Sequence, residues 1–267
     1  MSQLFAFFFG LLIGSFLNVC IHRLPRGRSV VKPRSHCVRC RKTIAWYDNI
    51  PLISYLLLRG KCRYCGRRIS IRYPVVELIT GLLFLYFSWT LGITPMAVKM
   101  CVFSAILVAL VFTDLEKRIL PDELTLGGTL VGLAFAALLP VPDITAQALL
   151  WLVGINVTGR MQWLTESAFG AALPALFLYG GGWIFYKLRH KEGLGLGDVK
   201  LIAMVGSFLG LRGALVTLIV GSVSGTVIGY GYIKATGRDP DQYQLPFGTF
   251  LGAGALASAL GLEKLLG

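Results

Sequence analysis

Charged side chains are scarce in this 267-residue sequence, and acidic ones are the scarcest. Asp and Glu together number 13, against 26 Lys and Arg, and all charged residues make up only 15% of the chain. Hydrophobic residues make up 55%, they come in long blocks, and the mean hydropathy is +0.69. A soluble domain of this length carries more charge, so the composition excludes that class and predicts a polytopic membrane protein.

A cleavable secretory signal is also missing from the pattern. No Lys or Arg precedes the first apolar segment, Leu4–Ile21, whereas arginines follow it at once. A secretory signal has its positive charge before the apolar stretch. We therefore expect residues 1–21 to be a retained first transmembrane span whose N-terminus lies outside.

The apolar segments predict an all-α fold of about eight transmembrane helices. We expect them over residues 4–21, 74–90, 96–113, 124–139, 167–188, 199–211, 214–233 and 247–262. The loops that this topology assigns to the cytoplasm hold most of the Lys and Arg, as the positive-inside rule requires. Topology therefore explains the net charge of +13 better than nucleic-acid binding does, and no nucleic-acid partner is expected. We expect Pro140–Glu166, which includes the stretch Pro142–Glu166, to be an external loop with a helix that lies on the membrane.

The long polar loop, residues 22–73, predicts a small metal-bound domain in the cytoplasm. It holds fourteen Lys or Arg, a single acid (Asp48) and two Cys-x-x-Cys pairs that are 21 residues apart. Two such pairs supply four thiolates for a tetrahedral Zn²⁺, although the gap is slightly longer than usual. Two disulfides or four free thiols are the alternatives, and a reducing cytoplasm disfavours the disulfides. The expected ligands of a structural zinc are Cys37, Cys40, Cys62 and Cys65.

Two carboxylates stand at the ends of apolar segments. Asp198 lies in the glycine-rich stretch GLGLGDVK (Gly193–Lys200), and Asp114 follows the segment that ends at Thr113. An acid in such a place is costly unless it is used or paired. Two aspartates that share a proton form the acid/base pair of an aspartyl protease. The expected topology places both of them at the cytoplasmic face.

Helix capping is the alternative explanation for Asp198 and for a third acid, Asp122. Asp198 can cap the helix that follows it, and Asp122, which comes after Pro121, is explained well as the cap of another helix. Asp114 ends a helix, where the dipole disfavours an anion, so it is the better partner for Asp198. The neighbouring glycines Gly195 and Gly197, together with Gly193, allow the backbone to bend and a substrate to approach closely.

These motifs resemble those of the bacterial type IV prepilin peptidases, which are bifunctional leader peptidases and N-methyltransferases. The resemblance covers nearly the whole length, on GSFLNVCIHRLP, WYDNIPLISYLLLRGKCRYCGRRISIRYPVVE, DLEKRILPDELT and GLGLGDVKLIA. It implies that Asp114 and Asp198 are catalytic and that the four cysteines are the zinc tetrad of the methyltransferase loop. It also implies a domain division into a first span (1–21), the cysteine loop (22–73) and a seven-span peptidase (74–267).

The activity that the resemblance implies has two steps. The enzyme cuts the basic leader from type IV prepilins and pseudopilins at the cytoplasmic face of the inner membrane, and then methylates the new N-terminus with S-adenosylmethionine. No Gly-rich strand–helix motif of a common S-adenosylmethionine fold is present, so the methyl transfer rests on the resemblance alone. No cofactor-binding residue is assigned, and Asp48, Asn49 and Glu77 are only polar candidates.

Two other functions compete with this one. A protease-only enzyme would use the cysteine loop as a scaffold. A proton-coupled transporter would use Asp114 and Asp198 as a relay, which predicts acids near the middle of the membrane. Both acids are expected at one edge, and this counts against the transporter.

Overall fold

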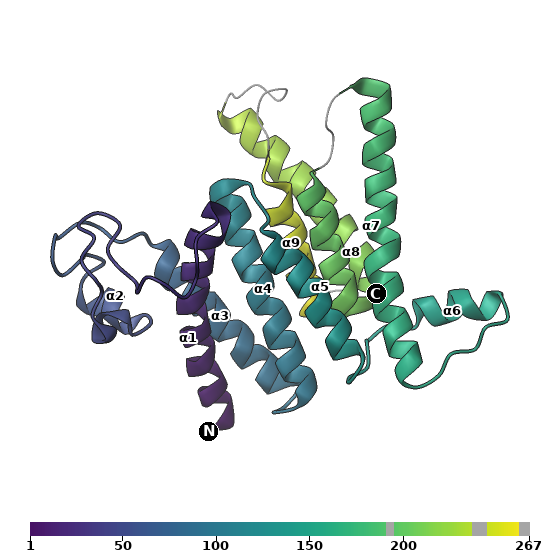
Figure 1. Ribbon diagram of the computed structural model, residues 1–267, viewed down its shortest axis with the longest axis horizontal. Helices are drawn as coiled ribbons and strands as arrows, with labels where there is room; N and C mark the ends of the chain where they lie inside the picture. The colour runs from purple at the N-terminus through teal and green to yellow at the C-terminus, as the bar shows by residue number, and fades with distance from the viewer. Residues whose placement is uncertain (191–194, 237–244, 262–267) are drawn as a thin grey trace. The chain divides into compact units, whose positions relative to one another are not determined.

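The computed structural model of the chain describes residues 1–190, 195–236 and 245–261 (Figure 1). Gly193 lies outside these described residues, as do the basic residues Lys191, Arg238 and Lys264. The described residues form α-helices, 3-10 turns and two isolated β-bridges, which confirms the all-α prediction. The chain divides into two compact units, residues 1–109 and 110–267, and the boundary falls inside helix α4.

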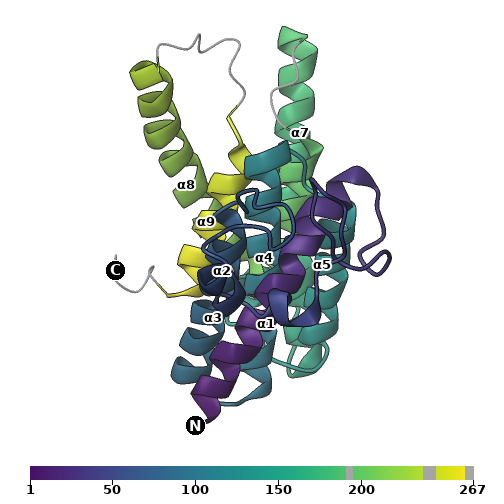
Figure 2. The same cartoon turned by 90° about the vertical axis from the view of Figure 1, so that its left-hand side faces the viewer.

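Unit 1 contains α1 (Ser2–Arg23), α3 (Arg72–Thr90) and the first part of α4 (Pro95–Lys117). Glycines bring the backbones of α1 and α3 together (Figure 2), because a Cβ atom on Gly14 would lie 2.7 Å from Cα of Glu77. Small residues give this kind of close helix contact in membranes. The loop between α1 and α3 carries three short helices: η1 (Leu24–Arg26), η2 (Trp46–Asn49) and α2 (Ile53–Leu57).

Unit 2 contains the rest of α4 and the helices α5 (Asp122–Ala136), α6 (Thr145–Leu152), α7 (Arg160–Arg189), α8 (Leu196–Thr236) and α9 (Phe247–Ala259). Helix α8 is interrupted at Gly210, whose φ of 79° and ψ of −174° are not helical. The Asp143 carboxylate accepts the N–H of Arg212 at 2.8 Å, directly after this break. The two parts of α8 correspond to the spans expected over residues 199–211 and 214–233.

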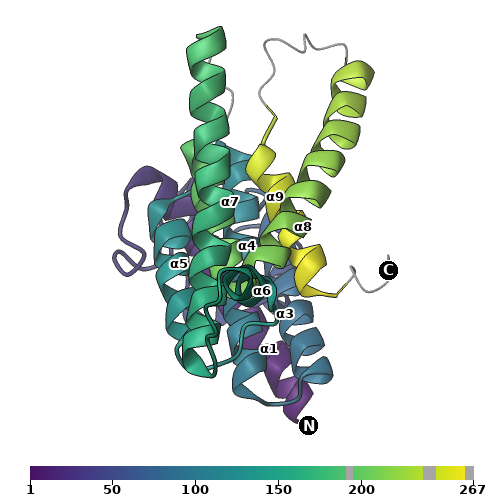
Figure 3. The same ribbon diagram turned by 90° about the vertical axis from the view of Figure 1, so that its right-hand side faces the viewer.

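The second part of α8 packs on α9 through a row of glycines (Figure 3). A Cβ atom on Gly221 would lie 2.8 Å from the Leu251 side chain, and one on Gly229 would lie 2.5 Å from the Leu245 side chain. Gly229 is thus near the start of α9, whereas Gly210 lies beside Asp143. The chain therefore changes direction at Gly210, and the second part of α8 runs from Asp143 toward the first residues of α9.

Five helices of the described residues are long and apolar enough to cross a membrane: residues 2–26, α3, α4, α7 and α8. Helix α9 is apolar but has only 13 residues, and α5 has 15. A multi-pass membrane protein is thereby confirmed. The count of eight crossings stays a prediction, because it needs two crossings within α8 and shorter ones at α5 and α9.

The stretch expected as an external loop with its own helix does contain one, α6. Its first turn is held by two buried acids. Asp143 accepts the N–H of Ile144 at 2.8 Å, and Glu166 accepts the N–H of Ala146 at 2.9 Å. Such bonds satisfy the N–H groups that a helix leaves open at its start. Large apolar side chains remain exposed near its end, and its position on a membrane stays a prediction: Trp151, Leu152 and Val153.

Candidate active site

Asp114 lies in the last turn of α4, which continues to Lys117, and the residue is only 5% exposed. Its Oδ2 atom accepts two hydrogen bonds from Thr249, one from the backbone N–H at 2.7 Å and one from the hydroxyl at 2.8 Å. Thr249 is the third residue of α9. The carboxylate is therefore held by a segment 135 residues further along the chain.

Asp198 lies inside the first turn of α8, which begins at Leu196, and it is half-buried. Its backbone N–H donates to the Gly195 carbonyl at 3.1 Å. The residue is thus past the position of a helix cap, where the side chain would bond to the N–H of the second or third residue after it. Capping does not account for this acid.

Leu120 lies between the residue that precedes Asp198 and the residue that precedes Thr249, the partner of Asp114. A Cβ atom on Gly197 would lie 3.2 Å from Cβ of Leu120, and one on Gly248 would lie 2.9 Å from its Cδ1. These two glycines directly precede Asp198 and Thr249. The negative charge of Asp114 also acts on Asp198. The structure therefore brings together the two acids that the sequence selected.

Asp122 and Lys200 form an ion pair beside this site, with 2.7 Å between Nζ of Lys200 and Oδ1 of Asp122. Asp122 is the first residue of α5 and makes no capping bond. The prediction that Asp122 caps this helix is therefore wrong, because its carboxylate is directed to α8 instead. The pair ties the start of α5 to the turn that carries Asp198.

The glycines before Asp198 differ in their surroundings. A Cβ atom on Gly195 would meet Oδ2 of Asp198 at 3.5 Å, an ordinary contact, whereas Gly197 stands at a close approach to Leu120. Of these two glycines, only Gly197 lies nearer to a neighbour than an ordinary contact. The expected role of Gly195 and Gly197 in admitting a substrate stays a prediction, and Gly193 lies outside the described part.

The four cysteines of the loop come together in unit 1. Their Sγ atoms all lie within 4.8 Å of one another, and those of Cys37 and Cys65 are 3.9 Å apart. None of them is in a disulfide. A tetrahedral Zn²⁺ with Zn–S bonds of about 2.3 Å has S–S edges of about 3.8 Å, so the cluster fits this ion.

Two family models cover most of the chain. Residues 8–91 match the bacterial peptidase A24 N-terminal domain, and residues 101–230 match the type IV leader peptidase family. Proteins named prepilin leader peptidase/N-methyltransferase are similar along most of the length. The one from Aeromonas salmonicida (strain A449) is 35% identical over 92% of this chain and 86% of its own length. The chain belongs to the type IV leader peptidase family.

Other members of the family give the same result. The prepilin leader peptidase/N-methyltransferase of Pseudomonas aeruginosa is 34% identical over 91% of this chain and 84% of its own length. That of Myxococcus xanthus (strain DK1622) is 41% identical over 88% of this chain, which spans 64% of that relative. No solved structure gives a significant match.

The cysteine cluster is built from two equivalent turns. In each turn the first cysteine donates its N–H to a carbonyl five residues later, Lys42 or Arg67, at 3.0 and 2.8 Å. The residue after the second cysteine has a positive φ in both turns, 58° at Arg41 and 65° at Gly66. The same backbone thus presents both pairs of thiols to one point.

The thiols of the cluster differ in acidity. Burial raises the pKa of Cys37, but the backbone N–H groups of Cys40 and Arg39 and the neighbouring thiols bring the pKa down to about 7. The backbone N–H of Arg67 lowers the pKa of Cys65, but burial and the other thiols raise it to about 11. Loading of a metal on this set therefore releases protons and depends on pH.

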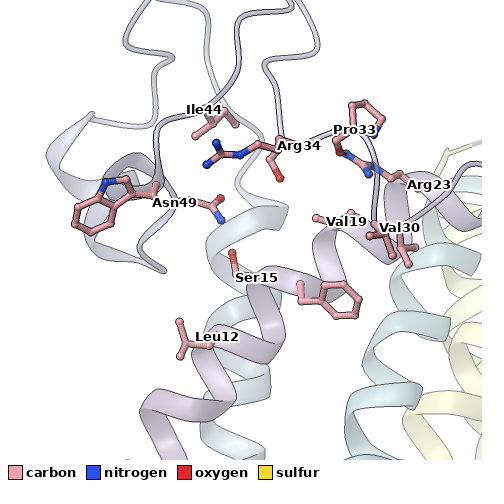
Figure 4. A pocket seen from close by; sticks show the side chains of 13 residues that line it. Leu12, Ser15, Val19, Arg23, Val30, Pro33, Arg34, Ile44 and Asn49 are labelled. Carbon is pink, nitrogen blue, oxygen red and sulfur yellow. Dashed lines mark hydrogen bonds between the residues drawn. The ribbon is translucent and has the colours of Figure 1, made fainter.

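Unit 1 of this family member also contains a cavity of about 400 Å³ between α1 and the loop (Figure 4). Ser15, Arg34 and Asn49 point toward this space. Arg23 lines it as well, but its guanidinium donates to the carbonyls of Ser29 and Pro33 and so holds the loop. The other lining residues are mostly apolar and include Leu12, Phe16 and Val19 of α1.

The three polar residues considered for cofactor binding, Asp48, Asn49 and Glu77, differ in their contacts. Asn49 lines the cavity. Asp48 is bound to the Arg63 guanidinium at 2.6 and 2.8 Å, and this partner lowers the pKa of its carboxyl group. Glu77 accepts the N–H of Leu52 at 2.9 Å, so it holds the loop on α3. Of the three, Asn49 alone faces an open volume among the described residues.

Sequence reasoning missed Thr249 and Gly248. The sequence predicts only the start of an apolar span at this stretch. The available signal is Gly248-x-x-x-Gly252, which predicts a close helix contact without naming its partner.

Proposed function

We propose that this chain is a membrane aspartic endopeptidase that removes the leader from type IV prepilins and pseudopilins, and then methylates the new N-terminus. The observation that carries the proposal is that Gly197 and Gly248, the residues before Asp198 and Thr249, both approach Leu120, while Thr249 binds Asp114 and the charge of Asp114 acts on Asp198. The names of the relatives supply the substrate class and the second reaction.

The cleavage uses the two aspartates as a pair that shares one proton. The ionised carboxylate takes a proton from a water, whose oxygen attacks the scissile carbonyl. The protonated carboxyl donates a hydrogen bond to the carbonyl oxygen and stabilises the charge that develops there. Proton transfer to the leaving nitrogen then breaks the C–N bond and gives the new amine of the pilin. The glycines before Asp198 leave backbone space for an extended peptide.

Substitution of either acid tests this function. Asp114→Asn and Asp198→Asn, each in the full chain in membranes, are expected to abolish cleavage of a prepilin. Cleavage that persists in either variant would exclude the aspartate pair. A proton-coupled transporter, the alternative from another class, predicts ion flux in proteoliposomes containing the purified chain.

The methyl donor of the proposed second reaction is S-adenosylmethionine, which supplies an electrophilic methyl group when bound. We assign it to the cavity of unit 1, on chemical grounds. A guanidinium, that of Arg34, can pair with the carboxylate of the donor, and the amide of Asn49 can bond to its adenine edge. The apolar wall from α1 suits the flat ring.

Calorimetry tests the donor site without any turnover. The full chain is titrated with S-adenosylhomocysteine, and Arg34→Ala and Asn49→Ala are expected to weaken binding about tenfold each. Arg67→Ala, outside the cavity lining, is the matched control. Unchanged binding in both cavity variants would exclude this site. Binding without transfer to a cleaved peptide would favour the protease-only alternative.

For the cysteine cluster we propose a structural Zn²⁺ held by Cys37, Cys40, Cys62 and Cys65. Four protein ligands leave no open position, so the ion folds the loop and does not touch the substrate. Metal analysis of the Cys62→Ser/Cys65→Ser variant is expected to show the loss of about one ion per chain, as a four-ligand site requires.

The location and the domain division belong to the same proposal. The basic loop after α1 supports an inner-membrane protein with its N-terminus outside and its active site at the cytoplasmic face. We propose residues 1–21 as the first span, 22–73 as the zinc loop that serves methylation, and 74–267 as the peptidase. Cysteine labelling from either side of intact cells tests the orientation.

A further inference from the structure

Both hydrogen bonds that Thr249 donates to Asp114 end on the same oxygen. The backbone N–H and the hydroxyl reach Oδ2 at 2.7 and 2.8 Å, whereas the carbonyl of Val111, the other acceptor within reach of the hydroxyl, is 3.5 Å away. The hydrogen bonds recorded for this carboxylate among the described residues thus meet Oδ2 and not Oδ1. The two oxygens of this carboxylate are therefore unequal.

Close packing of α9 on the end of α4 makes these bonds possible. A Cβ atom on Gly248 would lie 3.2 Å from both Cγ and Oδ2 of Asp114. One turn later, a Cβ atom on Gly252 would overlap the Val111 side chain. Glycines four residues apart let one helix backbone reach another. Any larger side chain at residue 248 would push Thr249 away from the carboxylate.

The backbone N–H fixes which oxygen can carry a proton. An amide N–H only donates, so the oxygen that it meets at 2.7 Å must accept. The two donors on Oδ2, the N–H and the hydroxyl, therefore disfavour a proton on this oxygen. A shared proton of the pair is left to Asp198 or to Oδ1 of Asp114. Thr249 also stands in the first turn of α9, where the helix dipole favours an anion.

We infer that Thr249 is a positioning residue of the peptidase, which anchors Oδ2 of Asp114 and turns Oδ1 toward the water that attacks the substrate. Asp114 is then the member of the pair that takes the proton from water, and Asp198 is the one that donates to the scissile carbonyl. This inference rests on the proposed function, since it assigns roles within that pair.

Three substitutions separate positioning from simple support of the fold. Thr249→Ser keeps both donors, and its kcat for prepilin cleavage is expected to stay within about twofold of the unaltered chain. Thr249→Val keeps the shape and the N–H but loses the hydroxyl, and its kcat is expected to fall about tenfold with KM unchanged. Thr226→Val is the matched control, because the Thr226 hydroxyl bonds only within α8, to the Ser222 carbonyl, and is exposed.

The outcomes are distinct. Normal kcat in Thr249→Val, or an equal loss in the Ser and Val variants, would overturn the inference, and so would a raised KM with unchanged kcat. If Thr249→Val unfolds, as shown by a lowered Tm, Thr249→Ala and Thr249→Cys provide the same comparison. Full cleavage by Asp114→Asn would instead remove the proposed function itself, while a dead Asp114→Asn with a normal Thr249→Val removes only the role of Thr249.

Discussion

Nζ of Lys200 lies 2.7 Å from Oδ1 of Asp122. Lys200 follows Asp198 by two residues, and Asp122 is the first residue of α5. The side chains are 32% and 58% exposed, so water screens the attraction. The pair is therefore worth little as a source of stability. The pair matters for its position, because it connects α5 to the first turns of α8, which carry Asp198.

We expect Lys200→Met to lower kcat several-fold and to leave Tm nearly unchanged. Loss of the pair frees the first turn of α8, whereas an exposed ion pair contributes only about 0–1 kcal/mol. Prepilin cleavage and thermal unfolding of the purified chain measure the two effects. The reversed pair, Lys200→Asp with Asp122→Lys, should regain part of the lost rate. A failure to regain it, or a large fall in Tm, would contradict this role.

Gly248→Ala is expected to impair cleavage and to destabilise the chain by about 1–3 kcal/mol. The new methyl group would lie 2.9 Å from Cδ1 of Leu120 and 3.2 Å from Oδ2 of Asp114, both nearer than ordinary contacts. Activity and chemical denaturation measure the effect.

Gly127→Ala is the control for that variant, because nothing lies within 4 Å of a Cβ atom there. Alanine within a helix is favoured over glycine, so this control should be neutral or stabilising by up to about 1 kcal/mol. Equal behaviour of the two variants would mean that the approach of α9 to Asp114 is loose.

The sequence singles out Asp114 and Asp198 as candidates, because an acid at the end of an apolar segment is costly and the chain has few acids. The four cysteines followed from ligand spacing, which is a local property. The role of Thr249 could not be predicted in this way, because its N–H and hydroxyl reach Asp114 only when α9 packs on α4. Asp122 was misjudged for a related reason. Local capping chemistry competed with a tertiary partner, Lys200, that the pattern does not reveal.

Lowering the pH should release the metal before it breaks the Asp48–Arg63 pair. The metal needs thiolates, so protonation of the cysteines competes with it as the pH falls below neutrality. The Arg63 guanidinium lowers the pKa of Asp48, so the stability that this pair gives is present above the ordinary aspartate pKa of about 4. It is lost only as the pH falls through the lowered value.

A colour reagent for free zinc and the near-ultraviolet circular dichroism of the loop measure these two steps. Asp48→Asn should reduce loop stability at pH 7, while Glu123→Gln, an exposed acid of α5, should not. A single transition for metal and loop structure, centred below pH 4, would show that thiol protonation does not control the metal.

Each cysteine turn contains one residue with a positive φ, Arg41 or Gly66. Exchange of these two residues should change the zinc affinity in opposite directions. Gly66 has a φ of 65° and nothing within 4 Å of a Cβ atom, so Gly66→Ala adds backbone strain alone. The left-handed conformation costs a non-glycine residue roughly 1–2 kcal/mol, and we expect the zinc affinity to fall accordingly, by about tenfold. Arg41, with a φ of 58°, already bears this cost, so Arg41→Gly should strengthen the site or leave it unchanged. Competition with a chelator measures both affinities. Tighter binding by Gly66→Ala, or a clear loss in Arg41→Gly, would mean that the two turns do not share the backbone geometry that holds the thiols together.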